Sequence, residues 1–132
     1  MMLQIEKGST LKNVQKQFNN YYPFLKIEFF KKIPVDQPIY KAEIFSTVDL
    51  AKYIDGAANK VVHIDVSRKR TVTEVEKDFE KLLGISAHVY RKSGNVWVET
   101  TLTNDWPLGE QNEEGRLISS HFTDNKPKPK NK

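Results

Sequence analysis

The sequence predicts an α+β domain built on a ferredoxin-like, duplicated β-α-β plan, and two observations carry this prediction. The same apolar pattern occurs twice, with an offset of 61 positions between Leu3 and Ile64. Each occurrence runs from strand-like alternation to helical spacing and then to a second apolar stretch. The aligned positions are Leu3, Ile5, Thr10, Leu11, Val14 and Phe18 in the first unit, and Ile64, Val66, Thr71, Val72, Val75 and Phe79 in the second.

Two such units, each with a right-handed crossover, predict one antiparallel sheet whose central strands are the first strand of each unit. Both helices would cover one face of this sheet, and the other face would be open. An extra strand after Gly94 would extend one edge. With 132 residues the chain is long enough to bury the core of a single domain, which we place at residues 1–122.

The first unit spans residues 2–31. Residues 2–7 alternate in polarity and predict a strand, and Ser9 or Thr10 has the chemistry to cap the helix that follows. Pro23 ends that helix, and residues 24–30, rich in aromatic and apolar side chains, predict the second strand.

Residues 32–60 form a connecting segment between the units. Pro34 and Pro38 make its beginning irregular, and residues 39–45 predict a short extended piece. A capping pattern followed by apolar residues predicts a short helix over residues 47–55, which Gly56 would end.

The second unit spans residues 61–101 and has clearer signals. Thr71 and Glu74 have the spacing of a capping box at the start of a helix, and Gly84 is a typical C-terminal cap. Residues 85–90 and 96–100 predict two strands of a hairpin.

The remaining chain predicts a C-terminal helical region at residues 104–122 and a disordered basic tail at residues 123–132. Pro107 fits the first turn of a helix, and Gly115 would end it. The tail contributes +3 of the net charge of +4, because four lysines stand against Asp124, so the rest of the chain is nearly neutral.

The best candidate site is the open side of the predicted hairpin. With Ser93 and Gly94 as its two-residue loop, Tyr90 would face Trp97 and His88 would face Glu99. Aromatic residues of this kind are enriched at binding hot spots, which favours a surface that binds another protein or a second copy of the chain. The alternative is that these four residues are covered, and that the aromatic pair stabilises only the hairpin.

A second candidate is the basic run Arg68, Lys69 and Arg70, which precedes the capped helix start where backbone amides favour an anion. Together with the lysine-rich tail, it makes weak nucleic-acid or phosphate binding the alternative function. An RNA-recognition sheet is disfavoured, since its two central strands would present Gln4, Glu6, His63 and Asp65 in place of an aromatic pair.

The sequence predicts no enzyme, no cofactor and no metal site. Its three histidines lack metal-ligand spacing, and no nucleophile elbow, phosphate loop or dinucleotide fingerprint is present. A catalytic role of His88 with Glu99 would require a pocket around them. The absence of cysteine and of long apolar runs predicts a cytoplasmic protein without a membrane partner, and nothing in the sequence defines a small-molecule ligand.

Two resemblances add to this interpretation. Residues 71–76, 90–101 and 105–112, together with 22–30 of the first unit, resemble a small family of uncharacterised proteins from Bacteroidetes-type bacteria. That resemblance implies a bacterial setting and carries over no activity. Residues 71–90 are similar to the helix region of ubiquitin-like proteins, which makes a β-grasp fold the alternative to the ferredoxin-like plan.

Overall fold

The computed structural model of the chain describes residues 1–6, 8–30 and 61–125, and the side chains of this part up to Ser120. The predicted extended piece at 39–45 and helix at 47–55 lie outside the described residues, as does most of the tail. In chain order the elements are β1 (Met2–Glu6), α1 (Leu11–Tyr21), β2 (Leu25–Phe30), β3 (Val61–Asp65), α2 (Val72–Leu83), β4 (Ser86–Ser93), β5 (Val96–Glu99), a 3₁₀ turn (Thr101–Thr103) and α3 (Leu108–Asn125).

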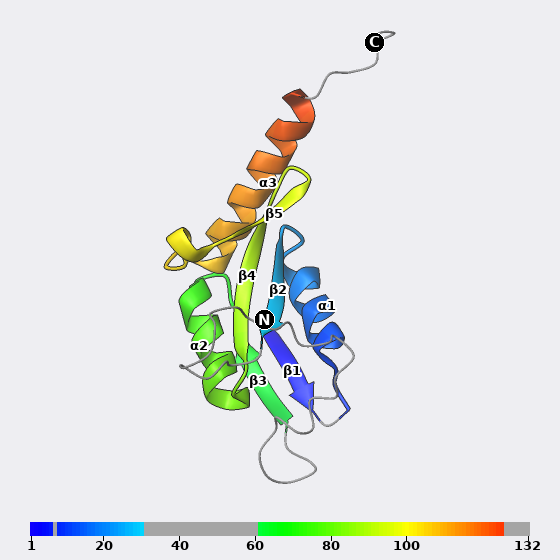
Figure 1. Cartoon of the computed structure of the whole chain (residues 1–132), viewed down its shortest axis with the longest axis vertical. Helices are drawn as coiled ribbons and strands as arrows, with labels where there is room; N and C mark the ends of the chain where they lie inside the picture. Colours follow the sequence, from blue (N-terminus) through cyan, green and yellow to red (C-terminus); the bar gives the residue numbers. More distant parts are fainter. Residues whose placement is uncertain (7, 31–60, 126–132) are drawn as a thin grey trace, which may run out of the picture.

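The α+β class, the two strand–helix–strand units, the extra strand and the C-terminal helix are confirmed (Figure 1). The described strands form two antiparallel sheets, β1–β3 and β2–β4–β5. Leu3 pairs with Ile64, so the first strands of the two units lie side by side as the ferredoxin-like plan requires. We expected one open sheet in which the first strand of each unit is central. Instead, β2 pairs directly with β4, with Glu28 opposite His88.

Side chains of α1 occupy the strand edges that this pairing leaves. The Gln17 side chain accepts a hydrogen bond from the Gln4 backbone N–H at 2.9 Å and donates to the Gln4 carbonyl at 3.0 Å. On β2, the carbonyls of Ile27 and Leu25 accept from the side-chain amides of Gln15 and Asn19, both at 2.9 Å. Helix α1 therefore lies along the outer edges of both β1 and β2, and satisfies backbone groups that a neighbouring strand would otherwise satisfy.

Helix α2 has the corresponding place in the second unit, where Glu76 accepts a hydrogen bond from the Val89 N–H at 3.0 Å. The six elements thus enclose the core in the order β1, β3, α2, β4, β2 and α1. Figure 1 shows the two helices on opposite sides of the strands. We expected both helices to cover one face of a single sheet, and this expectation is wrong. Polar side chains of α1 and α2 form hydrogen bonds to strand edges, and the apolar pattern of the sequence does not reveal such bonds.

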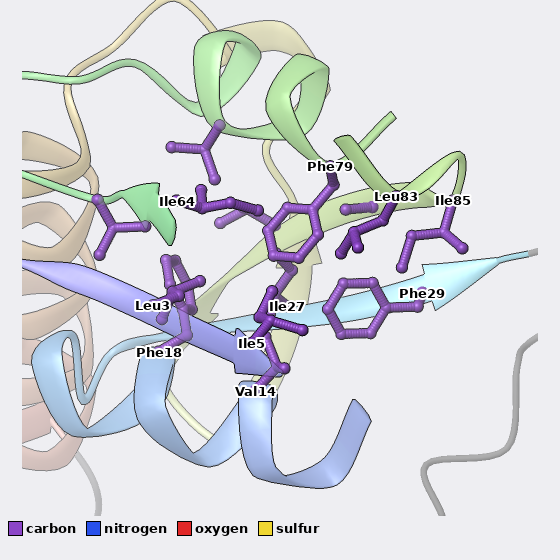
Figure 2. Close-up of a cluster of buried hydrophobic side chains, with 14 of the residues drawn as sticks. Leu3, Ile5, Val14, Phe18, Ile27, Phe29, Ile64, Phe79, Leu83 and Ile85 are labelled. Atoms are coloured by element: carbon purple, nitrogen blue, oxygen red, sulfur yellow. The ribbon is translucent and has the colours of Figure 1, made fainter. Parts of the chain in front are cut away.

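The core lies inside this ring, where apolar side chains of both helices meet those of the strands (Figure 2). Phe79 of α2 packs against Phe29 of β2 with ring centroids 5.1 Å apart, so the second unit's helix reaches the first unit's strand. The buried apolar residues of the two helices are Leu11, Val14 and Phe18 in α1, and Val72, Val75, Phe79 and Leu83 in α2. One shared core therefore holds the two units together.

Both helices begin at the predicted threonines. Thr10 accepts a hydrogen bond from the Asn13 N–H, and Thr71 accepts one from the Glu74 N–H, each within a reciprocal capping box. Helix α2 ends at Gly84, whose φ of 68° is the left-handed conformation that favours glycine at this position.

Helix α3 is longer than predicted, since it continues through Gly115 to Asn125 and so includes the first three residues of the predicted tail. Gly115 serves close packing instead of helix termination. A Cβ atom there would lie 2.9 Å from the Phe24 Cβ and 3.1 Å from the Arg91 Cγ. Helix α3 therefore approaches β2 and β4 more closely than a larger residue would permit.

Candidate functional site

The candidate site is the outer face of the three-stranded sheet, on the side that points away from the core and from α3. Alternation along each strand places nine side chains on this face, and we call them the outer face throughout. They are Lys26, Glu28 and Phe30 of β2, Ser86, His88, Tyr90 and Lys92 of β4, and Trp97 and Glu99 of β5.

Helix α3 packs on the opposite side of the same sheet. The Arg91 guanidinium donates to the Gln111 side-chain oxygen at 2.9 Å, and the Gly94 N–H donates to the Ser119 hydroxyl at 3.2 Å. The Arg91 guanidinium also lies 5.7 Å from the centroid of the Trp106 ring. Since Arg91 alternates with Tyr90 and Lys92, these contacts direct α3 away from the outer face.

The hairpin register differs from the prediction by one residue at the turn. The loop is Gly94 and Asn95, so Lys92 pairs with Trp97 and Tyr90 pairs with Glu99. Gly94 has a φ of 68° and Asn95 does not have a positive φ, which fits a type II′ turn with glycine at its first loop position. The predicted pairs of Tyr90 with Trp97 and of His88 with Glu99 are therefore wrong.

The predicted sharing of one face by these four residues nevertheless holds. When the loop moves by one residue, each residue of β4 pairs with a residue of β5 two positions further along, for example Tyr90 with Glu99 in place of Trp97. Residues two positions apart on a strand lie on the same side of the sheet, so the face on which each side chain lies does not change. Tyr90, Trp97, His88 and Glu99 all remain on the outer face.

Trp97 is half-buried, and two lysine ammonium groups lie near its ring. The Nζ atom of Lys26 lies 5.2 Å from the centroid of its ring, and that of Lys92 lies 5.9 Å away. Lys26 also lies 5.6 Å from the Tyr90 ring and 3.3 Å from a carboxylate oxygen of Glu28. The outer face thus combines an aromatic surface with two cations held by cation–π attraction.

Lys26 was missed by the sequence analysis. It belongs to the first unit, and only the direct pairing of β2 with β4 brings it opposite Tyr90. No sequence signal specified this pairing, because both strands have the same alternation and fit either an inner or an outer position.

His88 and Glu99 both line a small pocket of about 110 Å³, together with Glu76, Val89, Thr100, Thr101 and Asn104. The backbone of Val89 is held on this side by two side chains, since its N–H donates to Glu76 and its carbonyl accepts from the buried Thr100 hydroxyl at 2.8 Å. The His88 ring also packs edge-on against Phe30, with centroids 5.4 Å apart. Glu76 and Thr100, two polar side chains of the pocket, thus satisfy the backbone groups of Val89 at the edge of β4.

The basic run lies between β3 and α2, and its members differ in their surroundings. Arg70 forms an ion pair with Asp78 and donates to the Asp65 carbonyl, so hydrogen bonding to Asp78 raises the pKa of its guanidinium. Arg68 and Lys69 are exposed, and the Arg68 side chain lies against Gly109 at the start of α3.

The amides at the start of α2, which the anion hypothesis requires, already have partners. The N–H groups of Thr73 and Val72 donate to the carbonyls of Asn104 and Trp106, and the Glu74 N–H donates to Thr71. Glu74 in turn accepts from the Thr71 N–H, and this hydrogen bond lowers the pKa of its carboxyl. The anion site at Arg68, Lys69 and Arg70 stays a prediction, carried by the two exposed side chains.

A wider, open groove of about 390 Å³ lies between β1 and α1, far from the predicted residues in sequence. It is lined mainly by polar side chains, among them Gln4, Asn13 and Gln17. Asn13 takes part in the capping box and Gln17 bonds to the β1 backbone, so these groups are already used by the fold.

Within the described part of the chain, no group of three or more acidic or histidine side chains could hold a metal ion. No helix among the same residues has the length and apolar composition needed to cross a bilayer. No protein-family model, curated protein or solved structure matches the chain. Inferences about function therefore start from the geometry of the outer face.

Proposed function

We propose that the protein is a non-enzymatic binding module that recognises another protein through the outer face, with Trp97 as the main contact. The observation that carries this proposal is the half-buried Trp97 ring, whose centroid lies 5.2 Å from the ammonium group of Lys26 and 5.9 Å from that of Lys92. Tryptophan contributes strongly at binding hot spots, because it combines a large apolar surface with a polar N–H group.

The charge of this region favours a partner with acidic residues. Two lysines lie near Trp97, and because Glu28 offsets part of the charge of Lys26, Lys92 contributes most of the positive charge near the ring. An acidic side chain that approaches Trp97 would meet both cations, and partial burial on binding would strengthen these attractions. The setting that we propose is the cytoplasm of a bacterium.

The two other functions that the sequence raised have less support. An enzyme would use the pocket beside His88 and Glu99, where Glu76 and Thr100 bond to the backbone of β4. Weak nucleic-acid binding would use the basic run, in which Arg70 is paired with Asp78.

The experiment that tests the proposal is affinity capture from a lysate of the source organism, with quantitative mass spectrometry. We compare the natural chain with Trp97→Ala and with Tyr21→Ala, which also removes a partly exposed aromatic ring but lies on α1. We expect at least one protein to be captured by the natural chain and by Tyr21→Ala, and to decrease more than about 10-fold with Trp97→Ala. Equal capture by all three chains would contradict the proposal.

A further inference from the structure

The outer edge of β5 presents backbone groups that no described strand pairs. Among the strands that the structure describes, the sheet order is β2–β4–β5, so β5 has a strand neighbour on one side only. Ser93 and Val96 close the two-residue turn, so they form a hydrogen-bonded pair, and such pairs alternate along an antiparallel ladder. Arg91 and Val98 form the next hydrogen-bonded pair.

The remaining residues of β5, Trp97 and Glu99, therefore direct their N–H and C=O groups away from β4. The same alternation predicts that the Lys92 N–H points toward β2, and it donates to the Phe24 carbonyl at 2.9 Å. Among the described residues, no hydrogen bond to the outward backbone groups of Trp97 and Glu99 is found. Unpaired edge groups of this kind are a template for another strand.

The side chains of β5 limit what that strand can be. On the outer face Trp97 carries the two lysines, and Glu99, two residues later, is an exposed acid. On the other face, Val96 is 52% exposed and Val98 is half-buried. The strand itself thus carries one acid, Glu99, and an apolar side that is partly exposed. The two lysines near Trp97 come from the inner strands β4 and β2.

Such a strand is complementary to itself in one register. If two copies of β5 pair antiparallel through their outward groups, the symmetric registers place Trp97 opposite Trp97, Glu99 opposite Glu99, or Trp97 opposite Glu99. The second places two carboxylates directly opposite each other, which is destabilising, and the first directs the two sides that carry lysines toward each other. Only the third places each Glu99 next to Trp97 of the other copy, where the long Lys92 side chain of the adjacent strand can approach the carboxylate from the far side of the ring.

We propose that two copies of the chain associate through the outer edges of β5, about a two-fold axis at Val98, with Trp97 of each copy opposite Glu99 of the other. This register forms four backbone hydrogen bonds, two in each Trp97–Glu99 pair, and brings the two Val98 side chains together. It joins the two three-stranded sheets into one sheet of six strands. A two-fold axis fits the symmetry of most homodimers.

The inference concerns the edge of β5 instead of its outer face, and it holds whether or not that face binds a second protein. Sedimentation of the purified full chain tests it without any other partner. Because a four-residue edge buries little area, concentrations up to about 1 mM are needed to detect the dimer. We expect a concentration-dependent equilibrium between monomer and dimer.

Two charge reversals make the test specific. Glu99→Lys alone would place an added cation near the lysines of the other copy. Lys92→Glu alone would place an added acid near Glu99 of the other copy. We expect each variant alone to associate at least about 10-fold more weakly, and a mixture of the two to regain association as a heterodimer. Lys16→Glu, an equal charge change on the exposed side of α1, serves as the control and retains the dimer.

Thermal unfolding of each variant shows that the fold is intact before sedimentation is compared. A chain that stays monomeric at every concentration would overturn the proposal. So would a dimer on which Glu99→Lys and Lys92→Glu act no differently from Lys16→Glu, or a mixture that associates no better than its components.

Discussion

The two strand–helix–strand units contribute equally to the core and unequally to the surface. In the first unit, α1 bonds to the edges of its own strands through Gln15, Gln17 and Asn19, and each strand pairs with one other strand. In the second unit, β4 pairs with both β2 and β5, and α3 follows the hairpin. The additions to the second unit build the sheet face that carries Trp97.

This difference teaches that the shared pattern specifies the scaffold, while the departures from it locate the candidate site. Phe18 and Phe79 occupy aligned positions and are both fully buried, as packing alone requires. Trp97 has no counterpart among the described residues of the first unit. The first unit still contributes to the outer face through Lys26, because β2 lies beside β4.

Because both units contribute large buried side chains to the core, substitutions there should cause the largest loss of stability. Phe18→Ala and Phe79→Ala each remove a fully buried ring, and we expect each to lower the free energy of unfolding by about 3–5 kcal/mol. Chemical denaturation followed by circular dichroism measures this. Leu82→Ala, at a 43% exposed position of α2, is the control and should change stability by less than about 0.5 kcal/mol.

Both phenylalanine variants should retain a single cooperative transition, since the two units share one core. Two separate transitions, or a large loss in only one variant, would show that the units do not fold together.

Helix α3 packs against both units at Gly115, and a substitution there should lower stability by a smaller amount, although helix propensity alone would raise it. In Gly115→Ala, helix propensity alone would raise stability by about 1 kcal/mol. The added Cβ would lie 2.9 Å from Phe24 of the first unit and 3.1 Å from Arg91 of the second, so we expect a net loss of about 1–2 kcal/mol. Ser120→Ala, at an exposed position of the same helix, should be neutral or slightly stabilising. If Gly115→Ala raises the urea midpoint, α3 does not pack this closely.

A buried hydrogen bond between the units leads to a smaller effect that depends on pH. The Tyr22 hydroxyl, at the end of α1, donates to the Val66 carbonyl after β3 at 2.5 Å. Tyr22→Phe removes this bond, and we expect a loss of about 1 kcal/mol at neutral pH. Equilibrium denaturation of both chains at matched pH measures the difference.

Burial is the main reason that the pKa of Tyr22 is raised from 10.0 to about 12, and the nearby Arg68 charge opposes this shift. The protonated form is therefore favoured in the folded chain. Its contribution to stability is fully present below pH 10, and it is lost as pH rises from about 10 to about 12. Tyr22→Phe should lack this part of the alkaline loss, so the difference between the two chains should shrink above pH 10. A constant difference up to pH 12 would contradict the buried position of the hydroxyl.

The elements of the fold were accessible from sequence, because strands and helices have different apolar periods and threonine caps have a recognisable spacing. The neighbouring positions of β1 and β3 could be predicted, since they are the first strands of the two aligned units. The direct pairing of β2 with β4 was not accessible, since the amide side chains of Gln15 and Gln17 that occupy the other strand edges look like ordinary polar residues of a helix.

The candidate site was accessible in part for a similar reason. The alternation of side chains placed Tyr90, Trp97, His88 and Glu99 on one face even with an incorrect register. The choice between Ser93–Gly94 and Gly94–Asn95 as the loop was open, because glycine can occupy either loop position, and only the pairing of Ser93 with Val96 decides. Lys26 required the sheet order itself.

The central claim is that the interaction surface belongs to the outer face and not to the first unit's helix. Photo-crosslinking in cells of the source organism tests this most directly, with a photoreactive amino acid at Glu99 in one chain and at the exposed Lys16 of α1 in another. We predict a discrete adduct with a different protein at position 99 and none at position 16, as identified by mass spectrometry. Equal adducts at both positions, or the absence of a different protein from the adducts at position 99, would contradict the account.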